Sequence, residues 1–95
     1  MRVPDEFRDL GSSFYAGSDI GLTPEQWIVA RISILSAREK KRSLEFLNEL
    51  LDGKPDSRRL LEAWESAGSN YCFHEPDLVV FLKMLRDALE QQLQQ

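Results

Sequence analysis

The stretch TPEQWIVARISILSAREKKRSLEFLNELLDG, from Thr23 to Gly53, carries the start and stop signals of two consecutive helices. Thr23 and Gln26 have the spacing of a capping box, in which two side chains satisfy free backbone amides at a helix N-terminus. Ser36 and Glu39 repeat this spacing, and Gly53 is a typical left-handed terminator. The stretch therefore predicts one helix that begins at Thr23, and a second that begins at Ser36 and ends before Gly53.

Helical signals continue on both sides of this stretch. A short helix is expected to open at residues 4–6, where acids favour the positive end of a helix. Asp56 can cap a fourth helix that Gly68 ends, and Glu75 lies in the first turn of a last helix. No strand pattern is visible. We therefore expect an all-α bundle of about five helices, forming a single domain over residues 1–95, with residues 90–95 as a frayed tail.

Apolar residues on these segments predict a shared core. Trp27, Ala30 and Ile34 share one face of the second helix, and the adjacent face is also apolar. This wide arc predicts that the second helix is buried on more than one side, and wide arcs also commit the third and last helices to the core. The residues expected in one core are Trp27, Ile34, Leu47, Leu51, Trp64, Phe81 and Leu85.

Composition restricts the function classes. The chain has 95 residues, with 12 Lys and Arg against 16 Asp and Glu, and a net charge of −4. An acidic chain is a poor candidate for binding a phosphate backbone and a better one for binding a basic protein. The single cysteine, Cys72, allows no internal disulfide and suits the reducing cytosol.

No targeting or membrane signal is expected either. The first residues lack a basic start followed by an apolar run, so they do not read as a signal peptide. The apolar runs around residues 27–30 and 78–82 are far shorter than the roughly 18–20 residues that span a bilayer. We therefore expect a soluble cytoplasmic protein.

Candidate catalytic and metal-binding residues are few. Cys72 and His74 could supply at most two zinc ligands, and zinc needs three or four at recognisable spacing. Neither a nucleophile elbow nor a P-loop is present, and carboxylates at helical spacing suit a solvated face. We therefore expect no enzyme activity, no cofactor, no metal and no small-molecule substrate.

The strongest cationic run is Arg38–Arg42, within the first turns of the third helix. Glu39 interrupts it, and Glu45 and Glu49 dilute it further. Such a run more often forms a solvated face than a nucleic-acid contact. A helical regulatory or adaptor domain that touches nucleic acid through this run is the alternative function.

Two poorly helical segments, Ala16–Leu22 and Gly68–Glu75, remain for recognition, because loops on a rigid scaffold are where binding residues concentrate. Acids lie in or beside both, and the ring of Tyr71 could be buried while its hydroxyl reaches a partner. Whether the two segments are adjacent cannot be read from the sequence. The residues predicted to contact a partner are Asp19, Glu62, Glu65, Asn70, Tyr71 and Glu75.

Several blocks resemble those of small bacterial immunity proteins of the contact-dependent growth inhibition type, over nearly the whole chain. They are Phe7-x-x-Leu10, Gly17-Ser18-Asp19, Leu22-Thr23-Pro24-Glu25-Gln26-Trp27, Phe46-Leu47-Asn48-Glu49-Leu50-Leu51, Trp64-x-x-x-Gly68-Ser69-x-Tyr71-x-Phe73, and Phe81-Leu82-x-Met84-x-Arg86-Asp87. The resemblance implies a non-enzymatic protein that binds and blocks the toxic C-terminal domain of a delivered effector. No functional residue can be carried over by motif, and nothing identifies the toxin. The acidic balance fits a basic partner such as a nuclease.

Overall fold

The computed structural model describes residues 2–53, 56–69 and 71–94, and these form five helices and no strand. The helices are α1 (Asp5–Ser12), α2 (Pro24–Ile32), α3 (Ala37–Leu51), α4 (Ser57–Ser66) and α5 (Glu75–Leu93). The expected small all-α domain is confirmed.

The helices start where local chemistry predicts. The Thr23 hydroxyl accepts a hydrogen bond from the Gln26 amide at 3.1 Å, and the Gln26 side chain accepts one from the Thr23 amide at 3.0 Å. Ser36 and Glu39 form the same reciprocal pair at the start of α3, with both distances 3.1 Å. At α4, the Asp56 carboxylate accepts from the Arg58 amide. Side chains thus satisfy free amides at three helix N-termini.

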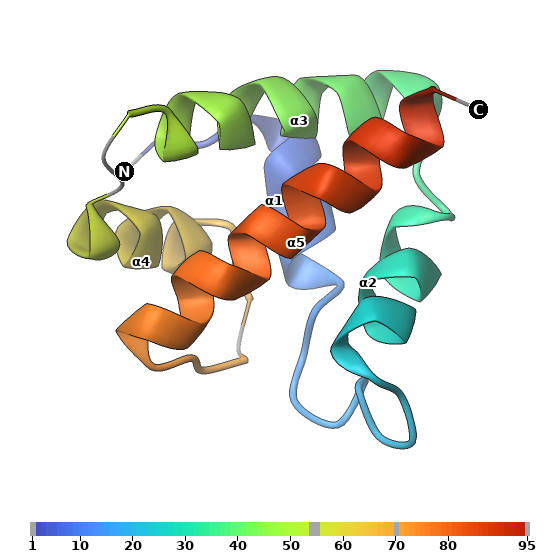
Figure 1. Cartoon of the computed structure of the whole chain (residues 1–95), viewed down its shortest axis with the longest axis horizontal. Coiled ribbons are helices and arrows are strands. Elements are labelled where there is room, and N and C mark those ends of the chain that lie inside the picture. Colours follow the sequence, from blue (N-terminus) through green and yellow to red (C-terminus); the bar gives the residue numbers. More distant parts are fainter. Residues whose placement is uncertain (1, 54–55, 70, 95) are drawn as a thin grey trace.

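The last helix organises the fold. In Figure 1, α5 crosses diagonally in front, with α3 along the top, α2 and α4 on opposite sides, and α1 behind. Helix α5 packs against α2, α3 and α4, and α1 packs against α3. The helix continues to Leu93, so it includes residues 90–93, which we expected to fray.

The centre of the core is a cluster of aromatic rings around Phe81. Its ring centroid lies 5.4 Å from that of Phe14, 5.6 Å from Trp27, 5.5 Å from Trp64 and 4.6 Å from Phe73. These separations fall in the range in which aromatic pairs attract beyond the burial of their area. Rings from α2, α4, α5 and two loops therefore meet at one point.

The prediction that Ile34 lies in the core is wrong. Ile34 is 75% exposed, whereas the other six expected core residues are buried. Helix α2 ends at Ile32, and the Ser33 hydroxyl donates to the Val29 carbonyl in its last turn. Because the backbone leaves the helix there, the helical spacing no longer places Ile34 on the face of Trp27, and Ile32 fills the inward position.

The expectation that α2 is buried on several sides is also wrong. Only Trp27, Ile28 and Ile32 are buried on this helix, while Ala30 is exposed and Val29 is 48% exposed. Helix α2 packs mainly on α5. A nine-residue helix at the edge of the bundle has one covered side, so part of its apolar arc faces solvent.

Gly11 shows why a helix-weakening residue lies inside α1. Its backbone is buried, and a Cβ placed on it would collide with the Cβ of Ala67 and lie 3.2 Å from the Ala67 carbonyl oxygen. Ala67 is the residue that ends α4. The glycine therefore permits the close approach of α1 and the end of α4.

Candidate partner-binding face

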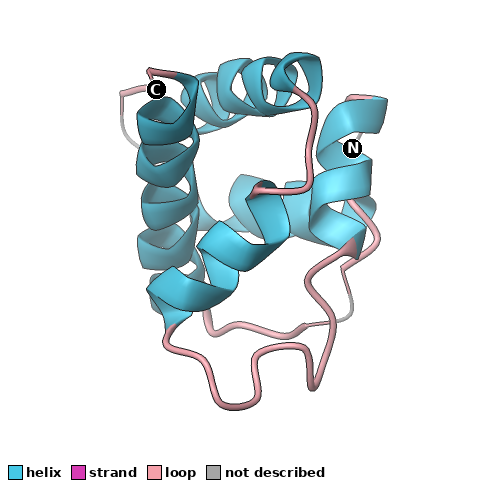
Figure 2. Ribbon diagram, turned by 90° about the vertical axis from the view of Figure 1, so that its right-hand side faces the viewer, coloured by secondary structure: helices cyan, strands magenta, loops and turns pink. Residues whose placement is uncertain are grey.

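The two loop segments predicted for recognition lie together at one end of the molecule. The Tyr71 hydroxyl donates to the Asp19 carboxylate at 3.1 Å, and the Ser69 hydroxyl donates to the Phe14 carbonyl at 2.6 Å. Figures 1 and 2 both show the corresponding loops side by side at the lower end. The structure thus decides the adjacency that the sequence left open.

The ring of Tyr71 packs on the core, and its hydroxyl joins the two loop segments. Its half-buried ring packs on Trp27 and Phe73, with centroid distances of 4.7 and 4.8 Å. Burial raises the pKa of the Tyr71 hydroxyl above its ordinary value of 10.0, and the hydrogen bond to Asp19 and the charge of Asp19 raise this pKa further. The neutral hydroxyl is therefore held as a donor to the carboxylate.

Each loop is also fixed by a buried tryptophan. The Trp27 indole N–H donates to the Ser18 hydroxyl, which itself donates to the Tyr15 carbonyl. The Trp64 indole N–H donates to the Tyr71 carbonyl at 3.0 Å. Both bonds run from a core ring to the surface loop, so core packing determines the shape of this end of the molecule.

The structure places the predicted contact residues unevenly. Asp19 and Tyr71 touch each other, and Glu65 borders a hollow that also includes Tyr71. Glu62 is exposed on α4, with its carboxylate 3.8 Å from the guanidinium of Arg58. Glu75 is exposed in the first turn of α5. Asn70 lies outside the described residues.

We call the surface of segments 15–22 and 71–75 with Ser69, Glu62 and Glu65 the loop face. Sequence reasoning missed Ser18 and Ser69 as the residues that hold it. Ser18 lies between the positive-φ glycines Gly17 and Gly21, and Ser69 follows the positive-φ Gly68. Both serines lie next to a turn glycine, and a buried tryptophan needs a hydrogen-bond acceptor. This combination is the sequence signal that could have indicated Ser18 and Ser69.

The other candidate residues do not converge. Cys72 and His74 are both exposed, and the described part of the chain contains no group of three or more potential metal ligands from His, Cys, Asp and Glu. Besides the Cys72 thiol and the His74 imidazole, the loop face offers hydrogen-bonding groups, carboxylate charge and apolar side chains. Hydrogen bonds, charge and apolar contacts are the interactions of a binding surface.

The basic run of α3 lies on a separate surface with mixed charge. Arg38, Lys41 and Arg42 border a hollow that also includes Glu6 and Glu45. The Arg42 guanidinium lies 3.5 Å from the Glu45 carboxylate. Helices α3 and α4 each pack chiefly on α5. On this surface of α3, acidic side chains lie among the basic ones.

No described helix combines the length and the apolar character that crossing a bilayer requires. In comparisons with known proteins, no family model, no curated protein and no solved structure matches the chain.

Proposed function

We propose that this chain is a cytoplasmic immunity protein that binds and neutralises the C-terminal toxin domain of a contact-dependent growth inhibition effector. The sequence blocks described above support the class of protein. The observation that carries the proposal is the loop face, where two acid-bearing loops distant in sequence are joined by the bond between Tyr71 and Asp19. Activity then consists of binding alone.

A preformed face suits tight capture. Its loops are held by the indoles of Trp27 and Trp64 and by the Ser69 hydroxyl, so little conformational entropy is lost when a partner docks. Ser18→Ala and Ser69→Ala loosen these bonds without truncating the buried tryptophans, so they are expected to weaken binding without unfolding the protein.

The acidic charge of this chain is expected to speed association with a basic toxin and to favour it over other partners. The net charge is −4, and Asp19, Glu65 and Glu75 have no basic partner within ion-pair distance among the described residues. A basic toxin is therefore attracted over a distance set by the ionic strength, about 8 Å at physiological salt. A nucleic-acid-cleaving toxin fits, because such proteins carry basic surfaces for their own substrate.

The direct test is co-expression with the C-terminal segment of a large secreted protein encoded next to this chain. Cell survival and co-purification of the two proteins are the expected results. Death of the cells despite soluble expression of this chain would contradict the proposal.

Substitutions on the loop face test where the toxin binds. Asp19→Asn removes a charge but keeps an oxygen that accepts from Tyr71, so slower association at low salt is expected with little change in dissociation. Tyr71→Phe keeps the ring but loses the bond, so faster dissociation is expected.

The double variant Glu62→Gln with Glu65→Gln should slow association, as should Asp19→Asn. Glu45→Gln with Glu49→Gln on α3 removes the same charge away from the loop face and is the matched control. Wild-type association and dissociation rates for all three loop-face variants would place the interface elsewhere.

A further inference from the structure

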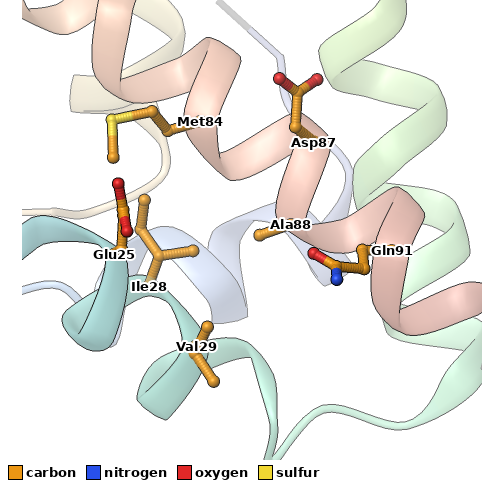
Figure 3. A pocket seen from close by; sticks show the side chains of 7 residues that line it. All are labelled: Glu25, Ile28, Val29, Met84, Asp87, Ala88 and Gln91. Carbon is orange, nitrogen blue, oxygen red and sulfur yellow. The ribbon is translucent and has the colours of Figure 1, made fainter.

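Two adjoining hollows form an elongated groove along α5. The first, of about 330 Å³, lies between α2 and α5 and is bordered by Glu25, Ile28, Val29, Met84, Asp87, Ala88 and Gln91. The second, of about 370 Å³, shares Met84 and continues towards the loop face, bordered by Pro24, Tyr71, Cys72, Phe73, Asp77, Val80 and Phe81. Figure 3 shows Met84 and Ala88 projecting from α5 on the side of α2, with Ile28 and Glu25 opposite them. We call this the α2–α5 groove.

The groove is apolar along its length and open to solvent. Val29 is 48% exposed and Val80 is 59% exposed, and both border it. Met84 and Ala88 are half-buried at its base. Val80, Met84 and Ala88 are spaced four residues apart, so they form a second apolar stripe on α5 beside its core stripe. An apolar stripe at this helical spacing is the kind of surface that helix-in-groove binding uses.

The charges on the groove are acidic. Among the described residues, no Lys or Arg borders either hollow. The Arg86 guanidinium lies 3.0 Å from the Asp87 carboxylate and offsets that charge. Glu25 and Asp77 have no such ion pair among the described residues. They lie in the first turns of α2 and α5, whose dipoles offset only about half a charge each.

We propose that the α2–α5 groove receives an amphipathic helix of the partner protein, with an apolar stripe flanked by Lys or Arg. This inference rests on the proposed function for the identity of the partner as a basic toxin. The groove follows α5 from Asp77 to Gln91, a length of about 21 Å at 1.5 Å per residue. A helix of about four turns covers this length and places anchors at i, i+3, i+4 and i+7. The partner's cations then face Glu25 and Asp77.

The experiment uses a synthetic probe in place of the toxin. The probe is a peptide of about 16 residues with leucines on one helical face and lysines beside them. A scrambled peptide of the same composition, with no apolar face, is its control. Titration followed by amide NMR should shift signals of residues 25–29 and 77–91 with the amphipathic peptide only. Absence of binding, or shifts centred on other residues, would overturn the proposal.

Two pairs of variants separate apolar and charge contributions. Val80→Gln with Met84→Gln should weaken peptide binding at least about tenfold, because two apolar side chains lose their contact. Ile34→Gln changes an even more exposed apolar residue outside the groove and should leave binding unchanged. Glu25→Gln with Asp77→Asn should weaken binding and flatten its salt dependence, unlike Glu45→Gln with Glu49→Gln. Unchanged affinity in both groove variants would overturn the proposal.

Other occupants give different results. A concentration-dependent dimer that disappears in the Val80→Gln, Met84→Gln variant would assign the groove to a second copy of this chain, which overturns the proposal.

Binding of the toxin itself distinguishes the groove inference from the proposed function. If the groove variant loses peptide binding but still captures the toxin with wild-type affinity, the groove inference fails and the proposed function stands. If the wild type captures no toxin yet binds the peptide in the groove, the proposed function fails.

Discussion

At the scale of single residues, the burial of Tyr71 and its bond to Asp19 make stability depend on pH in the alkaline range. The pKa of Tyr71 is raised in the folded protein, so the folded state holds this proton more tightly than the unfolded state. The stabilisation is fully present below the ordinary pKa of 10.0 and is lost as the pH rises through the higher folded value. Tyr71→Phe should therefore lose less stability than wild type between pH 8 and pH 11. Chemical denaturation at both values measures this, with Tyr15→Phe as the control that keeps the bond. The same pH dependence in wild type and Tyr71→Phe would contradict it.

Gly11 gives a second prediction at this scale. Alanine normally favours a helix over glycine by about 1 kcal/mol, yet Gly11→Ala should destabilise the protein by about 1–3 kcal/mol, because the new methyl group meets Ala67. Adding Ala67→Gly should recover part of this loss by removing one of the two colliding groups. Urea denaturation of the single and double variants measures the coupling. A stabilised Gly11→Ala protein would show that α1 and the end of α4 do not meet as described.

At the scale of the elements, the capping boxes should contribute measurably. Ser36→Ala removes the acceptor for the Glu39 amide and is expected to cost about 1 kcal/mol of unfolding free energy. Ser36→Asp keeps an acceptor at the same position and should retain most of the stability. Thermal melts followed by circular dichroism test this. Equal melting temperatures for Ser36→Ala and wild type would mean that the box is not formed in solution.

The elements also show what sequence could predict. Helix starts were correct because a cap is a local signal, readable over four residues at Thr23 and Ser36. The end of α2 was missed, because a serine that bonds the preceding turn gives no distinctive pattern, and Ile34 was therefore assigned to the core. The wide apolar arc of α5 was also visible in the sequence, but periodicity alone does not say which neighbour covers the part that includes Met84.

At the scale of the whole molecule, stability should depend strongly on the aromatic cluster. Trp64 is 1% exposed, contacts the rings of Phe14, Phe73 and Phe81, and donates to the Tyr71 carbonyl. Trp64→Ala should lower the unfolding free energy by about 3–5 kcal/mol. Denaturant titration measures this loss, and Ile34→Ala on the surface should cost far less. A melting temperature unchanged by Trp64→Ala would exclude this core.

The candidate site was predictable only in part at this scale. Both loops and their acids follow from local composition, but the contact between Asp19 and Tyr71 joins residues 52 positions apart. Such a contact depends on how α1, α2, α4 and α5 pack together, which no local pattern encodes. The joined loop face and the α2–α5 groove are consequently properties of the tertiary structure.

The position of Phe81 at the centre of the aromatic cluster also governs the order in which the chain can fold. Phe14, Trp27 and Trp64 all precede α5 in sequence, and each loses a ring partner when Phe81 is absent. During synthesis these three rings emerge before the helix that completes their packing, so the nascent chain exposes them until α5 leaves the ribosome. Native contacts close late and over long sequence separations, which slows folding compared with a bundle of sequential hairpins. Conditions that stall translation before α5 should therefore yield aggregation-prone fragments.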